Sequence, residues 1–357
     1  MRRLLPAVPA LLAFAAAGAA VARPPVGTPD GVEQKQDSAP TGLPTSSVPT
    51  FHDRPLEGRI AAGTAELGTP TTPARAVALA ATLAARLGQP ARTQSASGLA
   101  LAGSGDARVL GRTARELAGV RSSIRRLLRM NLDGDTSQLV LLERSRDRFE
   151  LADATLFSQA PLATRTAVLG LAEGHVVVLA WQDPDAGSFL AAAARCLAAA
   201  SIIEGGLSGR VVAPRAEDSD VEAPPESETP TSPAPDRTPA WFLEGLASQL
   251  AAATASPNAL EPRQRETGLR FLRGGGDPRR IFALPADDPQ WIVLDGVAQS
   301  VAFLAVQRLA EDAPANLDRL IGGLRAGRSW PDAWRDSLGG TPSSLAERLA
   351  RHHAVND

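Results

Sequence analysis

The chain of 357 residues contains no tyrosine, one cysteine, four histidines and one lysine. A single cysteine, Cys196, excludes a disulfide within the chain. The absence of tyrosine excludes a phenol as a hydrogen-bond donor to a reaction intermediate. The formal net charge of -2 at pH 7 gives no electrostatic reason to expect a nucleic acid as partner.

The N-terminus has the three parts of a secretory signal. Arg2 and Arg3 precede an apolar run over residues 4–20, and the small-residue site Ala20-Val21-Ala22 follows. An N-terminal membrane anchor is the alternative, but the run is short for a span and contains two prolines. We therefore predict a signal peptide over residues 1–22, a periplasmic or secreted protein, and contact with the membrane only through export.

Two segments have the composition of disordered chain. Residues 23–72 are rich in proline, serine, threonine and glycine, and they predict a disordered linker. Residues 216–236 are acidic and rich in proline, and they predict a disordered surface loop. The folded domain is expected over residues 73–355, with an α/β part over residues 73–184 and a helical part over residues 185–355.

The α/β part shows alternating helical and strand patterns. Asp106 is placed to cap a long helix, and Glu173-Gly174 separates two apolar runs as a tight hairpin would. The expected helices cover residues 73–87, 107–130 and a short segment from 146, and the expected strands cover residues 98–102, 138–143, 166–172 and 175–181.

Six arginines recur along the expected helix over residues 107–130. They permit two interpretations, an anion-binding ridge or a solvated face, and we favour the solvated face because no aromatic residues lie between them. These residues are Arg108, Arg112, Arg115, Arg121, Arg125 and Arg129.

The helical part opens on an alanine-rich helix over residues 189–203. Thr238 is placed to cap the next helix, and Pro239 suits its first turn. Further helical patterns cover residues 291–304, 317–327, 330–338 and 345–351. The fold class is therefore α+β, with a small β-sheet and packed helices followed by a mainly α-helical C-terminal half.

Residues 241–247 read W-F-L-E-G-L-A. This stretch resembles the W-x-x-E-G-L-A motif on the second metal helix of gluzincin-type, peptidase MA-like zinc metallopeptidases. The resemblance extends loosely from about Leu99 to Arg351. It implies a metallopeptidase-like fold in which Glu244 occupies the position of the third zinc ligand.

The sequence departs from that family where the chemistry is done. The alanine-rich helix lacks H-E-x-x-H, the pattern that supplies two zinc imidazoles and a general base. Ala194 and Ala198 stand where the family has histidine, and Arg195 stands where it has the catalytic glutamate. Val297 stands where such domains commonly have tyrosine. The resemblance thus implies a lost zinc site, with no metal and no cofactor.

Glu244 then needs another role, and two remain open. It is favoured by the dipole of the helix opening, or it pairs with an arginine across the former cleft, for which Arg195 is the candidate. The residues that the resemblance places in this remnant cleft are Glu244, Trp241, Arg195, Ala194, Ala198 and Val297.

Two functions follow as expectations. The first is a catalytically inactive, monomeric interaction module in the cell envelope whose partner is an unknown peptide or envelope protein. The second is a hydrolase with a rearranged site that combines Glu244, His175 and either Asp183 or Glu204.

Overall fold

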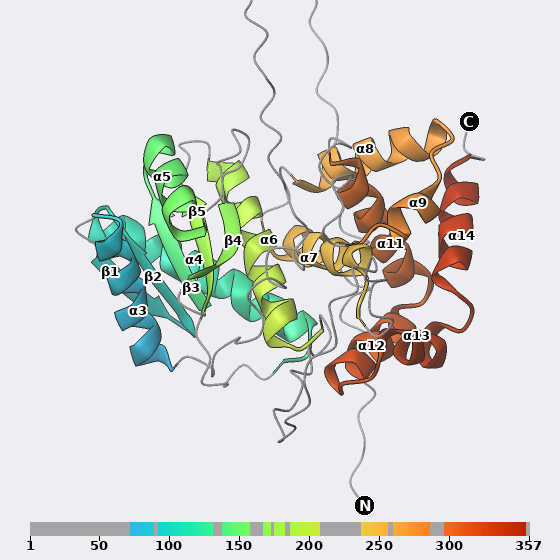
Figure 1. The fold of residues 1–357 in the computed structure, drawn as a ribbon, viewed down its shortest axis with the longest axis horizontal. Coiled ribbons are helices and arrows are strands. Elements are labelled where there is room, and N and C mark those ends of the chain that lie inside the picture. Colours follow the sequence, from blue (N-terminus) through green and yellow to red (C-terminus); the bar gives the residue numbers. More distant parts are fainter. Residues whose placement is uncertain are drawn as a thin grey trace, which may run out of the picture.

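A computed structural model gives the fold of the chain (Figure 1). The signal-peptide prediction, the linker prediction up to residue 71, the acidic loop and Asp183 lie outside the described residues. So does the start of the helix expected from residue 291. The structure describes residues 72–88, 92–130, 138–157, 167–172, 175–182, 186–207, 237–255, 260–285 and 296–354.

A five-stranded mixed sheet forms the first half of the domain, with strand order β1-β2-β3-β5-β4. The three central strands, β2, β3 and β5, are parallel, and the edge strands β1 and β4 are antiparallel to their neighbours. The strands are β1 Arg92–Ala96, β2 Leu99–Gly103, β3 Gln138–Glu143, β4 Ala167–Ala172 and β5 His175–Trp181.

Helices cover both faces of this sheet (Figure 1). Val140 and Leu142 of β3 join a core cluster with α4 (Ala107–Leu127) and α6 (Ala186–Glu204). Leu139 and Leu141 alternate with them and join a second cluster with α3 (Pro73–Arg86) and α5 (Arg146–Phe157). Because successive side chains of a strand point to opposite faces, an uninterrupted apolar run suits a sheet that is buried on both sides.

Most of the expected elements of this half are confirmed. The hairpin of β4 and β5 agrees with the predicted one to within a residue. Asp106 caps α4 by accepting a hydrogen bond from the backbone N–H of Arg108 at 2.7 Å. That helix ends at Leu127 rather than at residue 130, and the strand expected over residues 98–102 is β2, which begins at Leu99.

The second half is helical, as expected, so the α+β class is confirmed at this level. Its helices are α7 Ala240–Thr254, α8 Leu260–Arg273, α9 Pro278–Phe282, α11 Val297–Asp312, α12 Pro314–Arg325, α13 Trp330–Leu338 and α14 Pro342–Ala354. Figure 1 shows α7 between α6 of the first half and the remaining helices. Within the described residues, no helix is both long and apolar enough to span a membrane.

Glycines bring three of these helices unusually close together. A Cβ atom added to Gly245 of α7 would overlap the backbone carbonyl of Ala302 on α11. One added to Gly268 of α8 would lie 2.6 Å from Cδ1 of Leu304, also on α11. Any larger side chain at Gly245 must therefore push α7 away from α11.

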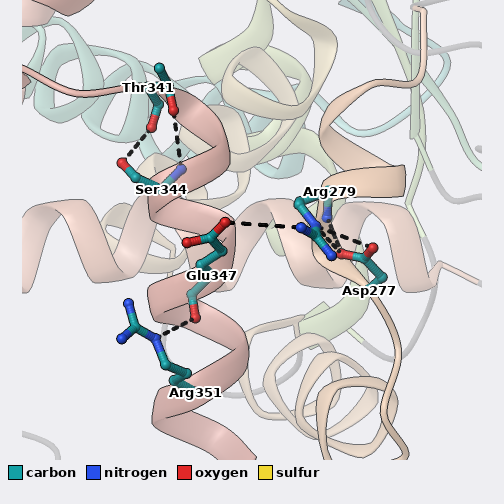
Figure 2. Close-up of polar contacts among 6 residues, drawn as sticks. All are labelled: Asp277, Arg279, Thr341, Ser344, Glu347 and Arg351. Carbon is teal, nitrogen blue, oxygen red and sulfur yellow. Dashed lines mark hydrogen bonds and ion pairs between the residues drawn. The ribbon is translucent and has the colours of Figure 1, made fainter.

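An exposed ion pair links the last helix to its neighbour α9, and local polar contacts lie at the start of each helix (Figure 2). Ser344 Oγ donates to the carbonyl oxygen of Thr341 at 2.6 Å in the first turn of α14. Further along, Glu347 lies 3.9 Å from Arg279, which also pairs with Asp277 at 3.1 Å. These exposed pairs fix orientation more than they add stability.

Candidate functional site

The helices α6 and α7 meet at an ion pair. Nη2 of Arg195 on α6 donates to Oε2 of Glu244 on α7. The Glu244 side chain is 4% exposed, whereas that of Arg195 is 31% exposed. The predicted pairing of Glu244 with Arg195 is confirmed.

The other role considered for Glu244, at a helix opening, is wrong. The helix α7 begins at Ala240 and has no acidic residue in its first turn, so Glu244 lies beyond the reach of the N-terminal dipole. Pro239 occupies the N-cap position, without a side-chain cap. Thr238 precedes the N-cap position and is not the cap either. Its hydroxyl donates at 2.6 Å to the carbonyl of Leu207. It ties the start of α7 to the turn after α6.

Burial disfavours the charged form of each partner, and the attraction between Arg195 and Glu244 offsets this desolvation cost. Burial alone lowers the pKa of Arg195, but Coulomb attraction and a hydrogen bond to Glu244 outweigh it and raise that pKa above its ordinary value. Arginine stays protonated at any ordinary pH, so Arg195 is a permanent cation. Its contact with Glu244 occupies the carboxylate that a zinc ion would require.

The two alanines beside Arg195 lie in the core. Ala194 and Ala198 are both fully buried within the main hydrophobic cluster. An imidazole at either position would need room that the methyl groups and their neighbours now fill. With only Glu244 left among the implied ligands, these residues do not fit a zinc site, which needs three protein ligands.

Trp241 belongs to an aromatic cluster rather than to an open surface. Its ring stacks on Phe282 of α9, with centroids 4.1 Å apart and planes 5° apart. It meets Trp330 and Trp334 of α13 edge to face, at 6.0 and 6.1 Å. Trp241 is 1% exposed, so in this structure it holds α7 against α9 and α13.

Val297, the last of the implied cleft residues, opens α11. It follows Gly296, whose φ of 76° places the helix N-cap in the left-handed region. Val297 is half-buried and packs against the main hydrophobic cluster. It therefore contributes apolar packing at this helix start.

A second ionic cluster lies at the C-terminal end of α6. Oε2 of Glu204 accepts a hydrogen bond from Nη1 of Arg125 at 2.9 Å and lies 3.9 Å from Nη2 of Arg121. Nearby, Gln138 donates to Ser201 Oγ at 3.1 Å. Burial lowers the pKa of Arg121 and raises the pKa of Glu204, in spite of their mutual attraction. The cluster ties α4 to α6.

This cluster corrects the expectation of a solvated arginine face. Arg121 and Arg125 are only 2% and 4% exposed. They lie four and eight residues after Leu117, a fully buried residue, so helical spacing puts them on the covered side of α4. That spacing was the signal available in the sequence. The other four arginines, Arg108, Arg112, Arg115 and Arg129, are exposed as expected.

Two acids of the proposed rearranged hydrolase site, Glu204 and Glu244, are not brought together. Glu204 lies nine residues after Arg195 on α6, which separates their backbones by about 14 Å along the helix axis. Glu204 and Glu244 thus pair with arginines at different places. His175 opens β5, opposite Ala172 in the hairpin. Among the described residues, no three His, Cys, Asp or Glu side chains are grouped so that they could hold a metal ion.

Comparisons with known proteins identify no family for this chain. No protein-family model matches it. A search of curated proteins also gives no match.

Proposed function

We propose that this chain is an exported, catalytically inactive protein with a peptidase MA-like fold that acts as an interaction module in the cell envelope. The ion pair between Arg195 and Glu244 carries the proposal. It neutralises the one acidic residue that the family resemblance assigns to zinc, and the neighbouring alanines supply no ligand.

Export is supported by the signal pattern over residues 1–22. A role in binding is supported by Arg195 at the α6–α7 contact, a partly exposed cation that Glu244 fixes on a rigid helical support. The proposed partner is a peptide or another envelope protein.

A hydrolysis assay tests the inactive character. The mature chain, starting at Arg23, is incubated with a fluorogenic peptide library with and without added zinc, next to Glu244→Ala. We expect both proteins to show only background cleavage. Cleavage by the wild type that is lost in Glu244→Ala would overturn the proposal in favour of the hydrolase.

A capture experiment tests the interaction role. Immobilised mature chain is exposed to envelope extract in three forms: wild type, Glu244→Ala, and a variant without residues 217–236. We expect a defined partner that the wild type retains and that Glu244→Ala retains less well. Retention of no specific partner by the wild type would contradict an interaction module.

A further inference from the structure

We propose that the partly exposed Arg195 side chain binds a carboxylate of a peptide or protein partner through its guanidinium, while Glu244 holds the guanidinium in place. This inference rests on the proposed function, because it names the ligand chemistry at the same α6–α7 contact. It assigns recognition to the arginine and not to the buried acid.

The exposure of the pair is one-sided. Glu244 is almost completely covered, and Arg195 keeps about a third of its side-chain area in solvent. A guanidinium has five N–H donors, and the contact with Glu244 uses a single one, from Nη2. Within the described part of the chain, Glu244 is the one carboxylate in ion-pair distance of Arg195. Donors therefore remain for a ligand.

Glu244 also prepares the guanidinium for binding. A free arginine side chain loses rotamer freedom when it captures a ligand, and this loss reduces the affinity. The contact with Glu244 limits that freedom beforehand, and the guanidinium carries its charge at any ordinary pH. The planar fork of a fixed guanidinium matches the two oxygens of a carboxylate.

The surroundings favour a ligand with a single negative charge. Arg195 is the one charged residue of α6 before Glu204, and its neighbours are small: Ala192 and Cys196 are half-buried beside it. Glu244 already compensates one positive charge, so a doubly charged phosphate gains less here than at an unpaired arginine cluster. A peptide carboxylate, from a C-terminus or from an acidic side chain, fits this cation best.

The single thiol of the chain offers a reporter at this point. Cys196 follows Arg195, is half-buried, and lies close enough to influence the arginine electrostatically. We would measure the rate of Cys196 alkylation by iodoacetamide, a neutral reagent, while titrating peptide probes. A bound peptide should cover the thiol and slow its alkylation saturably.

The probes separate the chemistry. Tetra-alanine with a free C-terminus is compared with its amide, and an acetylated, amidated glutamate peptide is compared with its glutamine version. Loss of the carboxylate should weaken binding by about tenfold or more, the range of a hydrogen bond to a charged group. Protection by one carboxylate source and not the other identifies which of them binds. Inorganic phosphate should protect only weakly.

Variants decide whether Arg195 is responsible. In Arg195→Gln/Glu244→Gln the charges disappear together, so no buried charge is left unpaired, and we expect carboxylate binding to fall about tenfold or more. The control is Arg129→Gln/Asp318→Asn, which removes another arginine–carboxylate pair, between the turn that follows α4 and helix α12, and should keep wild-type binding. Thermal unfolding of both variants reports whether the fold is intact.

Three results would overturn the inference: equal protection by acid and amide peptides, protection by phosphate as strong as by peptide, or unchanged binding in the Arg195/Glu244 double variant. If any of them occurs while envelope capture still succeeds and no cleavage is seen, the proposed function stands without this ligand. Glu244-dependent cleavage would instead remove the proposed function itself.

Discussion

The two ionic contacts of α6 bury opposite partners. In the middle of α6, the Arg195 side chain reaches solvent, while its partner Glu244 on α7 is covered. At its C-terminal end, Arg121 and Arg125 are covered, and Glu204 keeps 21% of its side-chain area exposed. The same helix thus holds one contact that presents a cation and another that hides two.

This difference separates a candidate recognition point from a structural tie. A buried charge costs several kcal/mol unless it is paired, so the carboxylate of Glu204 offsets part of the cost of covering Arg121 and Arg125. Arg195 can turn toward water if its partner is lost, which makes the α6–α7 contact less costly to alter. The comparison therefore predicts a definite order of effects when charges are removed.

The largest loss is expected for Glu204→Ala. This change removes the Glu204 carboxylate from two buried guanidinium groups and should lower the free energy of unfolding by about 3–5 kcal/mol. Urea unfolding followed by circular dichroism measures it. A loss smaller than that of Glu244→Ala would contradict the distinction between the two contacts.

Glu244→Ala should have an intermediate effect. The Arg195 side chain loses its partner but has solvent within reach, so we expect a loss of about 1–3 kcal/mol, the cost of an unsatisfied polar group. The same urea titration gives the value. A protein that no longer folds would show that Arg195 is as dependent on its partner as the covered arginines are.

Removing both charges of the α6–α7 pair should cost less again. In Arg195→Gln/Glu244→Gln the two amides can hydrogen-bond to each other, and neutral replacement of an ion pair is often close to neutral in stability. We expect the free energy of unfolding to stay within about 1 kcal/mol of the wild type. A loss equal to that of Glu244→Ala would mean that the charge itself stabilises the contact.

His353 on α14 gives the smallest effect and shows the reverse case, a basic group among cations. Burial lowers its pKa first, and His352, Arg273, Arg308 and Arg265 add repulsion. Because the unfolded chain then binds the proton more readily, stability should fall as the pH drops below about 6.5. His353→Gln should reduce that fall between neutral and mildly acidic pH in urea unfolding. Identical pH profiles would exclude this residue as a cause.

The sequence allowed correct prediction of elements whose pattern is carried by burial or by a local cap. An uninterrupted apolar run predicted β3, and Asp106 predicted the start of α4. The polar edge strand β1 was missed, because Arg92–Ala96 has no apolar alternation and depends on pairing with β2 through the turn at Ser97 and Gly98. Such pairing is a tertiary effect.

The candidate site was predictable in part. The pairing of Arg195 with Glu244 followed from the family resemblance, which places α6 and α7 next to each other. The burial of Arg121 and Arg125 was missed because six arginines on one helix suggested a common solvated face. Their partner Glu204 lies 79 residues after Arg125, so no local pattern indicated the pairing. The hydrogen bond from Thr238 to Leu207 was missed for the same reason, because Leu207 lies 31 residues before Thr238. The family itself stays a prediction.

The zinc content of the purified mature chain tests the central claim most directly. After dialysis against zinc and removal of the unbound ion, elemental analysis should find no stoichiometric zinc, because Arg195 neutralises Glu244 and Ala194 and Ala198 offer no ligand. One tightly bound zinc ion per chain, lost in Glu244→Ala, would contradict the account.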